Sequence, residues 1–169
     1  MKVAGVLLAT VAALVLQTTF ARFVARDAVP VDFVLVAVVY AGLRGGPVTG
    51  LLAGTFGGIV QDAMSSGVIG IGGLAKTTVG CLAGVIGTQF IVAKLIPRFV
   101  VFAAATVLHA VVFMGLYELL GLRDFGMPGL LLAGQAGSNA LLGVVALHLS
   151  DALPGAIDRR RAARPRLRR

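Results

Sequence analysis

Six apolar runs dominate the sequence, and each is bounded by charged residues or by glycine and proline. A transmembrane helix needs about 20 mainly apolar residues. The runs therefore predict six membrane-spanning helices, at residues 3–21, 28–43, 47–64, 74–93, 99–120 and 128–150. We expect an all-α membrane protein, a polytopic bundle in which residues 1–157 form a six-helix transmembrane domain.

The composition excludes a soluble domain. Hydrophobic residues make up 58% of the 169 positions and charged residues 13%, whereas soluble domains contain about 45–50% apolar and about 25% charged residues. The chain therefore has too little polar surface to cover a soluble core. Six spans would use about 120 residues, and the remainder is too short for a second folded domain. Any binding or chemistry must accordingly take place in or beside the bilayer.

The distribution of lysine and arginine predicts the orientation of the bundle, because short positively charged loops stay on the cytoplasmic side. With six spans and cytoplasmic termini, the inner side carries eleven such residues and the outer side three, Arg22, Arg26 and Arg123. We therefore expect a multi-pass protein of the cytoplasmic membrane with both termini in the cytoplasm.

Residues 158–169 form a basic cytoplasmic tail that supplies six of the eight net positive charges. An arginine beside anionic lipid contributes on the order of 1 kcal/mol. We expect the tail to anchor the chain to anionic lipid, with docking of an acidic cytoplasmic partner as the alternative and no role in nucleic-acid binding. Its arginines are Arg159, Arg160, Arg161, Arg164, Arg166, Arg168 and Arg169.

Glycines recur at intervals of four residues at the start of the third span and within it. Small residues at this spacing form a smooth face along which a second helix can approach closely in lipid. The face either packs within the chain or forms a groove for the transmembrane helix of a partner. The series consists of Gly46, Gly50, Gly54 and Gly58, and the fourth span repeats it at Gly80 and Gly84.

Several polar residues fall inside the spans, mostly in the half that the predicted topology places outside. An ionisable side chain in a span costs several kcal/mol unless it is paired or hydrated, so we expect these residues to form ion pairs or one polar cluster. The cluster would be either structural or a ligand pocket. Its candidate members are Asp32, Asp62, Lys76, Glu118, Gln135 and Asn139.

Two pairs among these residues have suitable spacing for direct contact. Asp62 and Lys76 flank the short linker 65–73 between neighbouring antiparallel helices, which predicts an ion pair that closes and orients these helices. Gln135 and Asn139 are four residues apart, so they share a helix face and could form hydrogen bonds with another helix.

Catalytic motifs are missing from the sequence. It contains no His-Glu-x-x-His pattern, no Gly-x-Ser-x-Gly elbow and no Walker loop. The Gly70–Gly73 run has no strand or βαβ unit around it, so it reads as a turn rather than a dinucleotide site. We therefore expect neither enzymatic activity nor a cofactor.

The order of these features resembles the rod shape-determining protein MreD family. The similarity covers residues 16–93 and includes the length of the chain and its short tails. It rests on Leu16-Gln17-Thr18-Thr19, Pro30-Val31-Asp32, Leu43-Arg44-Gly45-Gly46 with the glycine series, Asp62, Gly70–Leu74, Lys76-Thr77-Thr78-Val79-Gly80 and Gly84.

The resemblance implies a non-enzymatic membrane scaffold of the bacterial cell-elongation machinery, which supports rod shape and lateral peptidoglycan synthesis. It implies direct binding to the transmembrane helix of MreC. It implies indirect association with the SEDS-type glycosyltransferase, its transpeptidase and the actin-like MreB.

An alternative from a different functional class is the substrate-binding component of an energy-coupling-factor vitamin transporter. Those proteins are also six-helix bundles of this length, and the outer polar cluster would serve as their ligand pocket. The low aromatic content of 7% and the absence of tryptophan argue against a vitamin site, which usually uses stacking surfaces.

Overall fold

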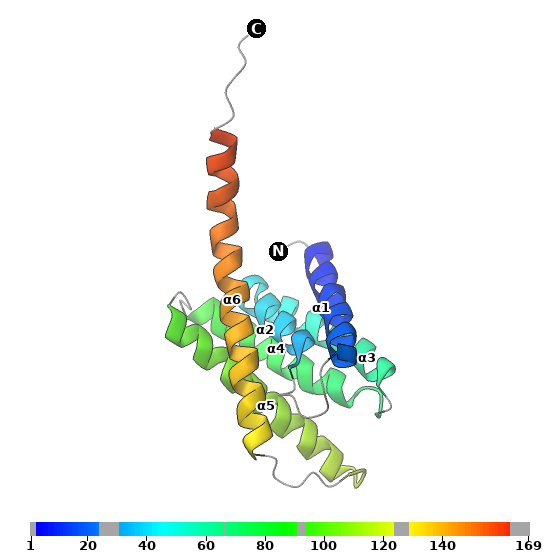
Figure 1. Cartoon of the computed structure of the whole chain (residues 1–169). Helices are drawn as coiled ribbons and strands as arrows, with labels where there is room; N and C mark the ends of the chain where they lie inside the picture. Colours follow the sequence, from blue (N-terminus) through cyan, green and yellow to red (C-terminus); the bar gives the residue numbers. More distant parts are fainter. Residues whose placement is uncertain (1–2, 24–30, 66, 91–93, 124–128, 163–169) are drawn as a thin grey trace.

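The computed structural model describes residues 3–23, 31–65, 67–90, 94–123 and 129–162, and these residues form six helices (Figure 1). The all-helical fold expected from the apolar runs is therefore confirmed. The helices are α1 (Val3–Phe23), α2 (Phe33–Gly45), α3 (Pro47–Met64), α4 (Ile71–Gln89), α5 (Leu95–Leu119) and α6 (Gly129–Ala162).

The helix boundaries differ from the expected ones mainly at α2, α4, α5 and α6. The α2 helix begins five residues later than expected, because Asp32 is its N-cap. The α3 helix begins and ends where the sequence predicts, whereas α4 and α5 each begin about one turn earlier. The α6 helix continues twelve residues beyond Ser150, so Arg159, Arg160 and Arg161 of the expected tail are part of it. The other four tail arginines lie outside the described residues.

Among the described residues, three helical stretches are long and apolar enough to cross a membrane, namely Ile71–Gln89, Leu95–Leu119 and Gly129–Ala152. Two further apolar stretches, Gly5–Phe20 and Phe33–Gly45, are shorter. Figure 1 shows the start of α1 and the end of α6 on the same side of the molecule. The chain thus enters and leaves the bundle at one end.

The short helix α2 lies at the centre of the bundle and contacts all five other helices. Up to Leu43 its sequence, FVLVAVVYAGL, is apolar on every face, which is typical of a helix surrounded by other helices. A single residue, Gly46, then joins α2 to α3 with a φ of +86°. Glycine adopts this left-handed conformation without steric cost, and Pro47 begins α3 at a position where its missing N–H is not needed.

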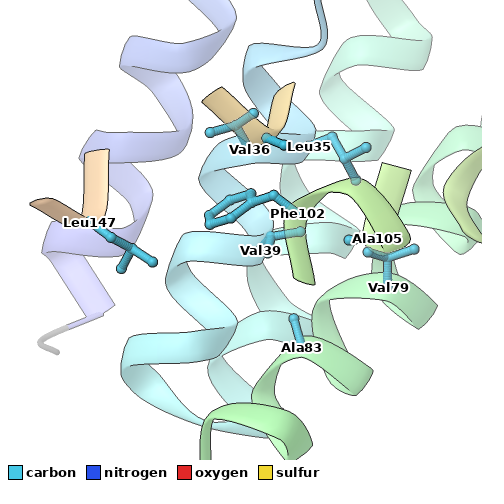
Figure 2. Close-up of a cluster of buried hydrophobic side chains, with 9 residues drawn as sticks. Leu35, Val36, Val39, Val79, Ala83, Phe102, Ala105 and Leu147 are labelled. Carbon is cyan, nitrogen blue, oxygen red and sulfur yellow. The ribbon is translucent and has the colours of Figure 1, made fainter. Parts of the chain in front are cut away.

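The apolar core has two parts that meet at α2. One part joins α2 to α4, α5 and α6, and Figure 2 shows Phe102 of α5 among Leu35, Val36 and Val39 of α2. On the α6 side, a Cβ atom at Gly143 would overlap the Phe102 ring, so glycine provides the space for this side chain. The other part joins α2 to α1 and α3 through Val6, Ala13, Leu14, Val34, Val38, Ala41 and Ala53.

The glycine faces of α3 and α4 pack against each other, which is the first of the two alternatives that the glycine spacing left open. A Cβ atom at Gly50 or Gly80 would overlap the backbone of the other residue, and one at Gly54 would overlap the Lys76 backbone. A Cβ atom at Gly58 would likewise overlap the Gly73 backbone, and one at Gly84 would overlap the Pro47 backbone. Gly46 is less confined, since its nearest neighbour would be a Thr88 methyl group at 3.6 Å.

Candidate functional site

A buried ion pair between α2 and α4 is the centre of the candidate site. The Asp32 carboxylate caps the start of α2 by accepting a hydrogen bond from the Leu35 N–H at 2.9 Å. Its other oxygen lies 3.0 Å from Lys76 Nζ, and the two side chains are only 7% and 4% exposed. The two charges neutralise each other, so both groups can remain away from water.

Helices α5 and α6 extend this pair into a polar network. Lys76 Nζ lies 3.1 Å from His109 Nε2 of α5, and an ammonium group can only donate, so the ring nitrogen accepts. The Asn139 side chain of α6 accepts a hydrogen bond from the Asp32 N–H at 3.0 Å. Its amide group also donates to the Thr106 hydroxyl of α5 at 3.2 Å. Four helices are therefore joined at one buried point.

The first helix is attached to the same region by Gln17. Its side chain accepts a hydrogen bond from the Phe33 N–H at 2.8 Å and donates to the Val31 carbonyl at 3.0 Å. These are backbone groups beside the N-terminus of α2, where the helix itself supplies no partners. We call Gln17, Asp32, Lys76, Thr106, His109 and Asn139 the buried polar cluster; it includes members of five helices.

The expected ion pair between Asp62 and Lys76 is wrong. Asp62 accepts hydrogen bonds from the Gly70 and Gly73 N–H groups at 2.9 and 3.0 Å, so α3 supplies the carboxylate that caps α4. Lys76 lies a further three residues along α4, about 4.5 Å along the axis. At that depth it faces Asp32 instead. The positive end of a helix favours a carboxylate at its first turn, and this satisfies Asp62 without a lysine.

Of the other candidates, Asn139 belongs to the buried polar cluster, whereas Glu118 and Gln135 do not. Glu118 is exposed near the end of α5, and Gln135 is half-buried one turn before Asn139. Neither side chain bonds to the cluster within the part of the chain that the structure describes. The expectation that Gln135 and Asn139 act together is therefore not supported by their contacts.

A second charged cluster, which the sequence did not suggest to us, joins α2, α5 and α6 at the opposite end of α2. Arg44 and Arg98 each bind one carboxylate oxygen of Asp151, and the distance from Arg98 Nη2 to Asp151 Oδ2 is 2.6 Å. Arg44 also donates to the Ser150 hydroxyl at 2.8 Å. The predicted topology placed both arginines and the end of the last span on one side of the membrane. Asp151, an acidic residue directly after the expected end of that span, was the sequence signal that could have revealed this cluster.

The buried polar cluster joins helices through hydrogen bonds and one ion pair. Within the described ranges, no group of three or more His, Cys, Asp and Glu side chains could hold a metal ion. The bonds of the cluster are instead satisfied between helices, which fixes the rotation of α4, α5 and α6 around α2. Such interhelical polar contacts are a known source of association between helices in lipid.

Apolar helices of membrane-crossing length, close glycine packing and a buried interhelical ion pair define a helical membrane protein without an extramembrane domain among its described residues. The family model for the rod shape-determining protein MreD matches residues 2–145. The chain therefore belongs to the MreD family, and the family resemblance inferred from residues 16–93 is confirmed. The comparisons with curated proteins and with solved structures found no match.

Membership of this family implies a role in rod shape determination. The family consists of membrane-associated shape proteins and is not a known enzyme family. Its match covers all of α1, α2, α3, α4 and α5 and the first half of α6. Every member of the buried polar cluster lies inside the matched range.

Proposed function

We propose that this chain is a non-enzymatic scaffold of the bacterial cell-elongation machinery that binds the transmembrane helix of MreC. Through MreC it would support lateral peptidoglycan synthesis by the SEDS-type glycosyltransferase and its transpeptidase, together with MreB. The observation that carries this proposal is the family match over residues 2–145. The match also favours the scaffold over the vitamin-binding alternative.

The scaffold would cross the cytoplasmic membrane six times, with both termini in the cytoplasm. The start of α1 and the end of α6 lie on one side (Figure 1), as an even number of crossings requires. The α2 helix has 13 residues and is about 20 Å long, which is short for a bilayer core of about 30 Å. Its five neighbouring helices shield it from lipid, so it does not need to match the bilayer thickness by itself.

Partner binding would use the exposed apolar faces, because the glycine faces of α3 and α4 are already occupied by each other. Large apolar side chains point outward on several helices, including Leu8 at 71% exposure, Leu52 at 53% and Leu141 at 62%. A bitopic partner contributes one helix, and packing along such a face would not require the bundle to open.

Photo-crosslinking tests this proposal and identifies the docking face. A photoreactive amino acid would replace one exposed residue per helix, Leu8, Leu52, Val107 or Leu141, in the full-length chain expressed with MreC. We expect one of these positions, or a neighbour on the same face, to crosslink to the MreC transmembrane segment. The buried position Val38, which is 0% exposed, serves as the matched negative control.

Depletion of the chain in its own host provides the functional arm of the test. Rod-shaped cells should become round when the protein is removed, and the wild-type gene should restore them. Copurification of an ATPase pair or of a bound vitamin instead of MreC would contradict the scaffold proposal and support the transporter alternative. Rod shape that persists without the protein would contradict both the scaffold and the shape-determining role.

A further inference from the structure

Two hollows adjoin each other along α4 and α5, one apolar and one basic. The apolar groove has a volume of about 360 Å³ and is lined by side chains of α4 and α5 only, among them Val79, Ile86, Val100 and Leu108. The basic pocket has a volume of about 100 Å³ and is lined by Leu43, Arg44, Gly87, Phe90, Arg98 and Leu147. On α4, the pocket residue Gly87 directly follows the groove residue Ile86 in the sequence.

Helical spacing places the two linings on shared faces. On α4, Val79, Ala83 and Ile86 of the groove are followed at the same spacing by Phe90 of the pocket. On α5, Arg98 of the pocket is followed by Val101, Ala105 and Leu108 of the groove. Intervals of three and four residues lie on one side of a helix. A ligand with a charged end and a long apolar end would therefore meet both linings in sequence.

The basic pocket is lined by two guanidinium groups. Among the described residues, Arg44 and Arg98 each bind one oxygen of Asp151. The hydrogen bonds that Arg44 makes to described residues both come from its Nη2 atom. Its Nη1 and Nε atoms have no partner among the described residues, so they can still donate single hydrogen bonds to phosphate oxygens.

The size of the apolar groove argues against a partner helix as its occupant. The groove extends over residues 79–86 of α4, a length of about 10 Å or two helical turns. A membrane-spanning partner helix is about 30 Å long, so this groove matches only a small part of it. An acyl chain is slender enough to lie in this space.

We propose that these hollows bind one anionic phospholipid, with its phosphodiester at Arg44 and Arg98 and an acyl chain between α4 and α5. The proposed topology places the two arginines on the cytoplasmic side, where the inner leaflet carries anionic lipid. This site lies inside the helical bundle and is separate from the lipid anchor expected of the C-terminal arginines.

Native mass spectrometry of the full-length protein in detergent tests the site, with dioleoyl phosphatidylglycerol as the probe. Dioleoyl phosphatidylcholine and inorganic phosphate are the comparison ligands. We expect one molecule of phosphatidylglycerol to bind more tightly than phosphatidylcholine, and Arg44→Gln to weaken its binding about fivefold. Arg123→Gln, at the other end of α5, is the matched charge control and should leave the affinity unchanged.

The acyl-chain half of the site is tested by filling the groove. Ala104 is an exposed lining residue, so Ala104→Phe should reduce phosphatidylglycerol binding without disturbing the core. Val107→Phe is the matched control, because Val107 is on the same helix, 42% exposed, and outside the groove lining. Far-ultraviolet circular dichroism of each variant verifies that the helices are retained.

Asp151→Asn separates lipid binding from a purely structural role of the arginines. If the cluster binds a phosphate, removal of the competing carboxylate should strengthen phosphatidylglycerol binding about fivefold. If the arginines only hold the helices together, Asp151→Asn should weaken phosphatidylglycerol binding as Arg44→Gln does, and this result would contradict the proposal. Equal binding of inorganic phosphate with no effect of Ala104→Phe would overturn the lipid assignment, as would phosphatidylglycerol binding that neither Arg44→Gln nor Ala104→Phe changes.

Discussion

The Lys76 ammonium group is buried at the centre of the bundle, with a residue exposure of only 3%. It is tolerated there because Asp32 and His109 both lie within hydrogen-bonding distance. Removal of one member of a buried ion pair is far more costly than removal of both, since the remaining charge has no partner. The stability of this protein at the residue scale therefore depends on complete pairing in the buried polar cluster.

A double-mutant cycle tests the pairing of Asp32 with Lys76. Lys76→Met should lower the free energy of unfolding by about 3–5 kcal/mol, because it leaves the Asp32 carboxylate buried and unpaired. Adding Asp32→Asn should recover most of this loss, since an amide can still accept from the Leu35 N–H. Unfolding in mixed detergent micelles measures both effects. A double variant as unstable as the sum of the single variants would contradict the pairing.

Asp62 should behave as a helix cap and not as the partner of Lys76. Asp62→Ala removes the acceptor for two N–H groups at the start of α4 and should cost about 1–2 kcal/mol. Asp62→Asn keeps an oxygen there and should cost less. Because Asp62 and Lys76 do not pair, the effects of Asp62→Asn and Lys76→Met should add within about 0.5 kcal/mol. Strong coupling between them in the same unfolding assay would restore the ion pair inferred from sequence.

Among the secondary-structure elements, α3 and α4 pack most closely, because their glycines allow the two backbones to come into contact. The Gly50 and Gly80 positions face each other without space for a methyl group on either side. In lipid, where no hydrophobic force joins helices, such close packing is a main source of association energy. The spacing of four residues is therefore a feature of the fold and not of a docking surface.

Alanine substitution distinguishes the packed glycines from the others. Gly50→Ala should destabilise the protein by about 2–3 kcal/mol, because the new methyl group would force α3 away from α4. Gly115→Ala, where nothing lies within 4 Å of the new atom, should be neutral or stabilising by up to about 1 kcal/mol. Thermal unfolding of both variants measures the difference. Intact stability of Gly50→Ala with loss of MreC binding would instead indicate a docking groove.

At the scale of the whole molecule, α2 organises the bundle and the charged clusters lie at its two ends. Asp32 at its start joins the buried polar cluster, and Arg44 in its last turn joins the Asp151 cluster. Both ends of this short helix are thus fixed to α6, which reaches both clusters through Asn139 and Asp151. This arrangement gives the proposed scaffold one rigid framework on which its exposed faces can bind partners.

Cysteine labelling tests the proposed topology of the whole chain. In a background in which Cys81 is replaced by serine, Lys94→Cys should react with an impermeant maleimide only after the membrane is opened. Arg123→Cys should react in intact spheroplasts, because six crossings place it on the outer side. Both residues are exposed, so burial does not limit either reaction. Labelling of both cysteines from the same side would contradict the six-span topology.

The bounds of α3 could be predicted from the sequence because Gly46, Pro47 and the Ser65 region mark them locally. The beginnings of α4 and α5 were placed too late, since Ile71 and Leu95 precede the apolar runs used to locate them. The position of polar residues within apolar runs of the sequence identifies Asp32, Lys76 and Asn139 as candidates. The contacts between these residues could not be predicted, because hydropathy gives the span of a helix but not its rotation about its own axis.

The apolar runs and the order of the motifs are sufficient to identify this chain as an all-helical membrane protein of the MreD family. An apolar chain in lipid must satisfy its backbone hydrogen bonds internally, and the helix does so within one segment. The contacts between polar groups, in contrast, depend on how the helices pack. Lys76 pairs with Asp32 and not with Asp62 because the packed glycines fix α4 against α3, and this contact sets the depth and direction at which Lys76 faces α2.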